Sequence, residues 1–383
     1  MSWDDLTGQA EAVATLRAAA EGDGLTHSWL LTGPPGSGRS VLAYAFAAAL
    51  IARPGTEAET EAQVTARTHP DLGVLSTEGV TILRKDVKEF VTSSYFSPSV
   101  GRYRVMVIED ADRMAELSSN VLLKALEEPP PRTIWILCAP SDADLLPTVR
   151  SRVRTVRLRV PDVDEVAELI SRRDGVSLPE ATRAAREAQS HIGMAHRLAT
   201  NAEARDRRAR TLELALGIRS VSGAVLAAAE LLAVAGDDAK AITEERDAEE
   251  RASALRSLGV EPGGTIPAGL RAQLKSLEED QKRRATRSLR DGLDRILVDL
   301  LSLYRDILLL QLGVRSDPVN LAIYSDLEAG ARATTPAATL ATLDAITEAR
   351  TRIEGNVAPA LALEAMLITA VRDTAHLSEK GRL

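Results

Sequence analysis

The residues with the clearest chemistry are 33–40, GPPGSGRS, a glycine-rich segment between two apolar runs. Their spacing is that of the phosphate-binding loop G-x-x-x-x-G-K-[ST], in which backbone N–H groups surround phosphate and the serine hydroxyl ligates Mg²⁺. Arg39 stands in the lysine position, and its planar guanidinium does not reproduce the point charge of an ammonium group. We expect a nucleotide cofactor to be bound by Gly33, Gly36, Gly38, Arg39 and Ser40. With arginine in place of lysine, the phosphates would be held in an altered geometry.

An acid pair, Glu109 and Asp110, follows the apolar run 104–108. Acids at the C-terminal end of an apolar strand form the Walker B arrangement, in which the first holds Mg²⁺ through water and the second polarises the attacking water. The usual order is Asp-Glu. The inverted order displaces both carboxylates by about one methylene, and misplacement of this kind costs rate. The alternative is a strand that ends in a solvated acidic turn, but the phosphate-type loop upstream favours a degenerate catalytic pair.

The elements that must position these groups alternate between strand and helix over the first part of the chain. Apolar runs predict strands at residues 28–32, 74–76, 103–108, 133–138 and 154–158. The Ala/Leu-rich run 41–52 predicts the helix after the loop, and the polar segment 53–68 predicts a loop or loose helix. Strands alternating with helices indicate an α/β domain with a mainly parallel sheet.

Beyond residue 160 the sequence predicts only helices. Short helical patterns broken by Gly175, Pro179 and Gly193 indicate a small helical subdomain. The run 285–312 carries apolar residues at 3/4 spacing, as an amphipathic helix does. The charge-dense segment 237–258 predicts a solvated helix, and residues 259–269 predict a loop.

The bulk composition excludes several functions. The net charge is −8 over 383 residues, which argues against broad contact with the DNA backbone, and aromatic residues at 3% do not make a base-stacking platform. The single cysteine, Cys138, lies in an apolar run and predicts a buried thiol without a role in zinc binding. The five histidines show no metal-ligand spacing. Without a signal peptide or an apolar span of membrane length, a cytoplasmic protein is expected.

A third motif, residues 120–130, NVLLKALEEPP, resembles the NALLKTLEEPP signature of the bacterial clamp-loader branch of AAA+ proteins. Other segments resemble family motifs in the same order: the adenine-side box at 3–9, the HPD turn at 69–72, the SRC motif at 146–153 with Val153 in place of cysteine, and the collar end at 356–364. The resemblance implies an α/β P-loop AAA+ domain (1–159), a helical lid subdomain (160–207) and an all-α collar domain for oligomerisation (208–383).

Within this family, the departures resemble the delta-prime subunits of the DNA polymerase III clamp loader. Arg39 replaces the lysine, the acid pair is inverted, and His196 stands where a motor subunit has its phosphate-sensing arginine, although Arg197 is adjacent. By contrast, Arg152 of the SRC-like motif is retained. The resemblance implies that it acts as an arginine finger on the nucleotide of the next subunit. A surface ion pair is the alternative, and Arg150 is a weaker candidate for the same role.

The resemblance implies a stator subunit without independent enzyme activity. It would bind ATP and Mg²⁺ weakly or without hydrolysis. No zinc is expected, because the four-cysteine module of related subunits is absent, and no other metal site is expected. The implied partners are gamma/tau and delta subunits, with the sliding clamp and primed DNA engaged through the complex, and no membrane. An active gamma/tau-like ATPase is the main alternative, which Ser40, Glu109, Asp110 and Arg197 support. An AAA+ adaptor outside replication is a third.

Overall fold

The computed structural model describes residues 3, 6–77, 81–257 and 271–380 of the chain. Contacts divide the chain into two compact units, Met1–Thr200 and Asn201–Leu383. The expected loop at 259–269, and Asp4 and Asp5 of the N-terminal box, lie outside the described residues. The finer division at residues 159 and 207 stays a prediction.

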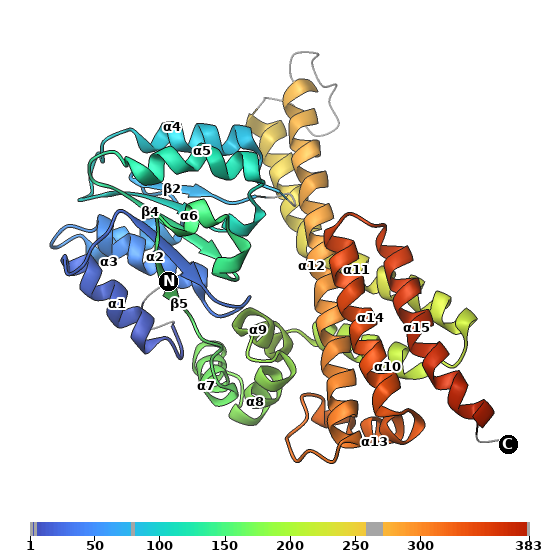
Figure 1. The fold of residues 1–383 in the computed structure, drawn as a ribbon. Coiled ribbons are helices and arrows are strands. Elements are labelled where there is room, and N and C mark those ends of the chain that lie inside the picture. The colour runs from blue at the N-terminus through green and yellow to red at the C-terminus, as the bar shows by residue number, and fades with distance from the viewer. Residues whose placement is uncertain (1–2, 4–5, 78–80, 258–270, 381–383) are drawn as a thin grey trace. The chain divides into compact units, whose positions relative to one another are not determined.

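The first unit is built on a five-stranded parallel sheet (Figure 1). Its strands are β1 (Ser28–Thr32), β2 (Leu72–Leu75), β3 (Arg104–Ile108), β4 (Thr133–Ala139) and β5 (Arg154–Arg157), in the order β2-β3-β4-β1-β5. The five expected strands are confirmed with small differences at their ends. The largest is at β2, an edge strand that is only half-buried. β1 and β4 are buried throughout, as continuous apolar runs at the centre of a parallel sheet should be.

Helices cover both faces of this sheet. They are α1 (Ala10–Glu21), α2 (Arg39–Ile51), α3 (Glu57–Thr65), α4 (Arg84–Ser94), α5 (Glu116–Glu127) and the short α6 (Pro147–Arg150). Because successive strand residues point to opposite faces, Trp29 and Leu31 pack in one core with α1 and α2, whereas Leu30 and Trp135 pack in a second core with α4 and α5. Figure 1 shows α1 and α2 on one side of the sheet, and α4 and α5 on the other.

The cysteine expected in a buried strand is confirmed. Cys138 is a free, buried thiol in β4. Burial raises its pKa to about 12, so the thiol stays protonated at neutral pH. A protonated, buried thiol packs as a small apolar side chain.

A short helical segment completes the first unit. It consists of α7 (Val163–Asp174), α8 (Leu178–Glu187) and α9 (Ile192–Thr200). Gly175 ends α7 in the left-handed region with φ 68°, and Pro179 lies in the first turn of α8. The expected break at Gly193 is wrong, because Gly193 lies inside α9. The chain turns earlier, at Gln189 and Ser190, whose φ angles of 50° and 63° end the helical path.

Among its described residues, the second unit has helices and connecting loops and no strand. It contains α10 (Ala202–Gly217), α11 (Val221–Ser257), α12 (Arg271–Gln311), a 3₁₀ turn (Leu321–Ile323), α13 (Tyr324–Ala333), α14 (Pro336–Glu354) and α15 (Pro359–Lys380). The expected amphipathic helix is confirmed within α12. Its Leu293, Leu297 and Leu300 are buried in one core with Leu231 of α11 and Leu363 of α15. An all-α region after a P-loop-type α/β region agrees with the expected fold class.

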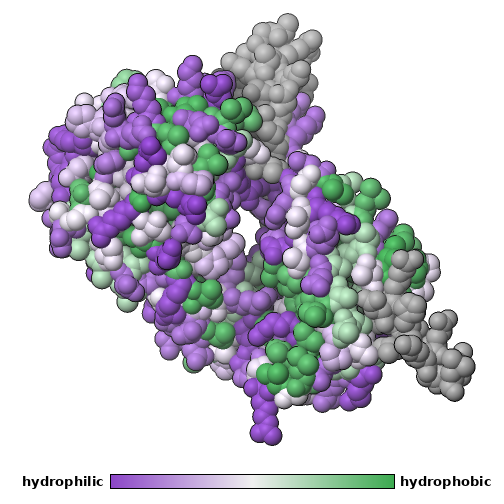
Figure 2. All heavy atoms as spheres, in the orientation of Figure 1, coloured by the Kyte–Doolittle hydropathy of each residue, from purple (hydrophilic) through white to green (hydrophobic). Residues whose placement is uncertain are grey.

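Figure 2 shows hydrophilic and hydrophobic residues interspersed over the face in view. Of the helices in the described part of the chain, none combines the length and apolarity needed to cross a bilayer.

Candidate functional site

The glycine loop joins β1 to α2, as its motif requires. Gly36 and Gly38 have φ angles of 80° and 93°, which side chains other than glycine rarely adopt. Gly38 is the N-cap residue of α2 and makes no side-chain cap, so Arg39 and Ser40 open the helix. The first N–H groups of a helix lack partners within it and carry its positive dipole end. The loop therefore retains the backbone geometry of an anion site.

The loop is anchored from behind by Gln9, which is almost fully buried. Its Nε2 donates to the carbonyl of Ser37 at 3.3 Å and to that of Arg159 at 2.9 Å, and its Oε1 accepts from the N–H of Arg159 at 3.1 Å. One amide thus joins the N-terminal box, the glycine loop and the segment that leads into α7. The sequence placed Gln9 only inside a motif and did not predict this role.

A second contact reaches the loop from the segment between α8 and α9. A Cβ atom on Gly36 would collide with the ring of His191, and Ile192 donates its N–H to the carbonyl of Gly36 at 3.3 Å. The ring nitrogen Nδ1 of His191 accepts from the N–H of Met194 at 3.1 Å. These contacts give His191 a structural role against the glycine loop, which the sequence did not predict.

Arg39 does not lie as a free cation over the loop. The side chain is half-buried, and its Nη1 is buried without a hydrogen-bond partner, as is Oγ of Ser37. Burial raises the pKa of Asp112, with Asp110 adding to the rise, while Arg113 and Arg39 oppose it. Arg39 therefore acts electrostatically on Asp112, one of the acids that follow β3. Oγ of Ser37 and Nη1 of Arg39 could therefore both donate hydrogen bonds to a bound phosphate group.

Glu109 directly follows β3, as expected, but its carboxylate already accepts hydrogen bonds within the chain. Its Oε1 accepts from the phenol of Tyr44 at 2.7 Å and from Nη2 of Arg67 at 2.8 Å. The guanidinium of Arg67 also lies over the Tyr44 ring, 5.2 Å from its centroid. Burial, and then the hydrogen bond to Glu109, raise the pKa of Tyr44. Tyr44 follows Ser40 by one helical turn, so helix periodicity could have revealed it; Arg67 gave no such signal.

Arg152, the arginine of the SRC-like motif, forms an ion pair with Glu127 at the end of α5. Nε and Nη2 of Arg152 both contact Oε1 of Glu127, with Nε at 2.7 Å, and about a third of the Arg152 side chain is exposed. Its Nη1 donates to the carbonyl of Thr148 at 2.7 Å and to Oγ of Ser151 at 3.0 Å. Arg150, the weaker candidate, is exposed. The role of Arg152 as a trans arginine stays a prediction.

His196, predicted to stand in the position of a sensing arginine, pairs with an acid of α7. Its Nδ1 lies 2.7 Å from Oδ2 of Asp174. Burial raises the pKa of Asp174, but hydrogen bonds from Arg173 and His196 outweigh it and leave the pKa lowered. Arg197 is half-buried one residue further along α9. These contacts hold the helices α7 and α9 together.

The HPD-like turn is a structural feature. Asp71 is fully buried and accepts four hydrogen bonds from the segment 99–101: Oδ1 from N–H and Oγ of Ser99, and Oδ2 from the N–H groups of Val100 and Gly101. Burial raises its pKa, but these bonds outweigh that effect and lower it to about 2. His69 accepts from the Asp71 N–H, and burial lowers the pKa of His69.

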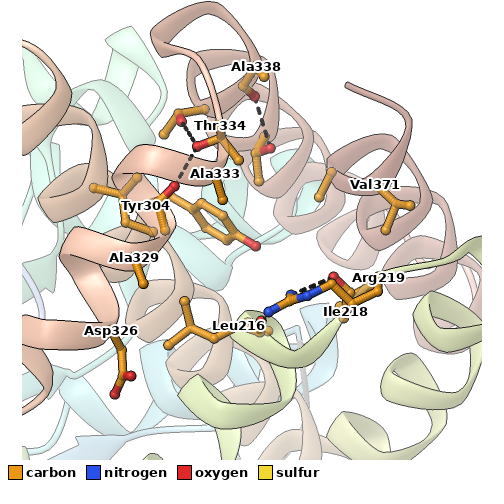
Figure 3. Close-up of a pocket in the computed structure, with 16 residues that line it drawn as sticks. Leu216, Ile218, Arg219, Tyr304, Asp326, Ala329, Ala333, Thr334, Ala338 and Val371 are labelled. Carbon is orange, nitrogen blue, oxygen red and sulfur yellow. Dashed lines mark hydrogen bonds between the residues drawn. The ribbon is translucent and has the colours of Figure 1, made fainter. Parts of the chain in front are cut away.

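The second unit contains a cavity of about 600 Å³ that the sequence did not suggest. Tyr304 of α12 points into it, and Arg219 lies on the opposite wall (Figure 3). Arg219 donates to the carbonyls of Leu216 and Ile218. Burial raises the pKa of Tyr304 to about 12, with Arg219 opposing the rise. Apart from this phenol, this guanidinium and the carboxylate of Asp326, the walls are mainly alanine, leucine, isoleucine, valine and threonine.

The first unit has a parallel sheet with a glycine loop after β1 and acids after β3, and a small helical segment, α7–α9, follows β5 in the chain. These features define a P-loop protein of the AAA+ type. Residues 8–162 match the family model "DNA polymerase III, delta subunit". This part of the chain is similar to the bacterial clamp-loader branch of AAA+ proteins, and the named relatives include delta-prime and gamma/tau subunits.

Three relatives illustrate the similarity. The delta-prime subunit of Pseudomonas aeruginosa is 36% identical over 134 residues, 33% of this chain and 41% of the relative. That of Bacillus subtilis is 24% identical over 220 residues, 56% of this chain and 66% of the relative. The gamma/tau subunit of Mycobacterium tuberculosis is 27% identical over 194 residues, 47% of this chain and 33% of the relative. This chain thus spans about a third of the length of that gamma/tau relative.

Among solved structures, a gamma-subunit-related protein of Thermotoga maritima aligns with 94% of this chain and 99% of its own, at 16% identity and a TM-score of 0.43.

Proposed function

We propose that this chain is the delta-prime, or stator, subunit of the DNA polymerase III clamp loader. It would complete a ring of AAA+ subunits with gamma/tau and delta through its C-terminal helical unit. It would also supply Arg152 to the nucleotide of a neighbouring subunit. ATP-driven loading of the sliding clamp on primed DNA would follow from the assembled complex, which supplies most of the contact with DNA. The match of residues 8–162 to the family model and the delta-prime relatives support this assignment.

One contrast carries the proposal. The groups that would serve the chain's own nucleotide are altered: Arg39 replaces lysine, Glu109 is bound by Arg67 and Tyr44, and His196 pairs with Asp174. The group that would serve a neighbour, Arg152, is present and partly exposed. An arginine aimed at a transferring phosphoryl group stabilises its developing charge and is worth about 10³–10⁵ in turnover. Loss of the chain's own catalytic groups with retention of this one is the pattern of a stator.

The test is the variant Arg152→Ala in a clamp loader reconstituted from gamma, delta and this chain. ATP turnover should fall to the level of a complex that has lost one active site, and clamp loading should fall by about tenfold or more. Arg157→Ala is the matched control, because Arg157 is an exposed arginine that pairs with a different acid, Asp142. Unchanged turnover and loading in Arg152→Ala would contradict the trans role.

The main alternative is an active gamma/tau-like ATPase. The gamma/tau relatives, together with Ser40, Asp110 and Arg197, favour it. Steady-state turnover by the isolated chain separates the two readings. Magnesium-dependent hydrolysis of many ATP molecules per chain, lost in Arg39→Ala, would establish the ATPase and overturn the stator assignment. Capture of clamp-loader subunits by the chain would also separate both from an AAA+ adaptor outside replication.

A further inference from the structure

The position where AAA+ proteins hold Mg²⁺ is filled here by a cation of the chain itself. A carboxylate oxygen offers about two lone-pair sites. On Glu109, Oε1 already accepts from Tyr44 at 2.7 Å and from Arg67 at 2.8 Å. Only 14% of the Glu109 side chain is exposed, against 48% for Arg67. Arg67 therefore covers the acid from the solvent side, the side from which a hydrated ion would approach.

This donor set does not fit Mg²⁺. The ion demands octahedral oxygen coordination and keeps several of its waters, so it needs room and unengaged carboxylate oxygens around it. An ion placed at the remaining oxygen, Oε2, would meet the positive guanidinium of Arg67 at close range. Tyr44 adds no charge to offset that repulsion, because burial and its bond to Glu109 keep its phenol protonated.

The backbone indicates that the arginine is held in place. After α3 the N–H of Arg67 bonds to the carbonyl of Val64 and that of Thr68 to the carbonyl of Gln63, which is the hydrogen-bond pattern of a Schellman motif. Arg67 occupies the left-handed position, with φ 59°, where glycine is usual. A side chain in this strained position aims at Glu109 and stacks on Tyr44. Strain at a residue whose side chain fills a site is a pointer to function.

We propose that Arg67 replaces the divalent cation at Glu109, so that the glycine loop binds a nucleoside polyphosphate without metal. Arg67 and Arg39 then supply the positive charge beside the phosphates, while the loop's N–H groups supply the hydrogen bonds. The loss of Mg²⁺ removes the ion that would neutralise charge on the transferring phosphoryl group. The inference rests on the proposed function and gives a reason why the chain's own nucleotide site would not hydrolyse ATP. It is tested on the isolated full-length chain, independently of Arg152.

The first experiment measures binding of ATPγS, a slowly hydrolysed ATP analogue, by titration calorimetry in excess Mg²⁺ and in EDTA. The two dissociation constants of the wild-type chain should agree within about threefold. In Arg67→Gly, which suits the left-handed backbone, binding in Mg²⁺ should become about tenfold or more tighter than in EDTA. Tyr44→Phe, which removes only the phenol donor, should shift in the same direction by less.

Arg132→Gly is the matched control, because Arg132 is also an exposed arginine in the left-handed region, with φ 61°, and is not a partner of Glu109. It should behave as the wild type does. The second experiment follows Mn²⁺ by electron paramagnetic resonance with ADP and chain present. Bound Mn²⁺ should appear in Arg67→Gly and not in the wild type. Metal-dependent ATPγS affinity, bound Mn²⁺ in the wild type, or no ATPγS binding in either buffer would each overturn the proposal.

Discussion

Arg152 and Glu127 form an ion pair in which Nε and Nη2 of the guanidinium share one carboxylate oxygen. This edge of the guanidinium is the one that would grip a phosphate with two parallel hydrogen bonds. If Arg152 serves the nucleotide of a neighbouring subunit, as proposed, Glu127 would compete with the phosphoryl group for this edge. Nη1 donates separately to the carbonyl of Thr148 and to Oγ of Ser151. These two bonds would keep the side chain oriented if its ion pair with Glu127 broke.

The first prediction concerns this competition. In the reconstituted complex, Glu127→Gln should raise ATP turnover, because it weakens the hold on Arg152 while preserving side-chain shape. Both partners are about a third or more exposed, and exposed pairs are worth about 0–1 kcal/mol, so the rise should not exceed about fivefold. Steady-state phosphate release measures it, with Glu128→Gln, the neighbouring exposed glutamate, as the control. A fall in turnover would mean that Glu127 positions the arginine instead of restraining it.

A second prediction concerns Asp71, whose pKa is lowered from 3.8 to about 2 in the folded chain. A carboxyl whose pKa is lower in the folded than in the unfolded state adds stability that is complete above the unfolded pKa and disappears as the pH falls through the folded pKa. The shift corresponds to about 2 kcal/mol at neutral pH. Asp71→Asn should therefore lower the free energy of unfolding by about that amount at pH 7 and by much less near pH 2.

Urea unfolding followed by tryptophan fluorescence checks this, because Trp3, Trp29 and Trp135, all the tryptophans of the chain, lie in the first unit. Asp86→Asn, in the first turn of α4 and exposed, is the control. Equal stability of wild type and Asp71→Asn at pH 7 would refute the assignment.

A third prediction concerns Gln9. Its side chain makes three hydrogen bonds that join the glycine loop to the segment before α7, and each is worth about 1 kcal/mol net. Gln9→Ala should lower the free energy of unfolding of the first unit by about 2–3 kcal/mol. It should also speed amide exchange at residues 36–40. Gln63→Ala is the control, since the amide of Gln63 donates to Glu59 one turn away. Unchanged exchange in the loop would show that Gln9 does not anchor it.

A fourth prediction concerns the second unit. Asn320 is almost fully buried; its N–H and Nδ2 donate to Asp306 at 2.8 and 2.9 Å, and its Oδ1 accepts from Arg208 at 2.6 Å. Asn320→Ala would remove one donor to the buried carboxylate of Asp306 and one acceptor of the Arg208 guanidinium, at a cost of about 3 kcal/mol. Loss of helix by circular dichroism should come at lower temperature, while the fluorescence transition of the first unit stays in place. Coincident wild-type curves would contradict this.

Much of the fold was predictable because its signals are local. Continuous apolar runs identify β1 and β4, and a parallel sheet buries such strands on both faces. The glycine spacing at 33–40 requires positive φ angles, and Gly36 and Gly38 have them. The error at Gly193 is also instructive. Glycine only permits a turn, whereas the chain turned at Gln189 and Ser190, two residues that gave no local warning.

The sequence by itself determined the class of fold, the position of the loop and acid pair, and the presence of Arg152, because all depend on neighbours within one element. The tertiary structure alone decided what those groups touch. Arg67 meets Glu109 across 42 positions of sequence, and Arg152 meets Glu127 across 25. Contacts of this kind depend on how the sheet brings separate loops to one edge, and no periodicity records them. The Arg67 contact shows that Glu109, an acid of a catalytic-type motif, is already paired within the chain.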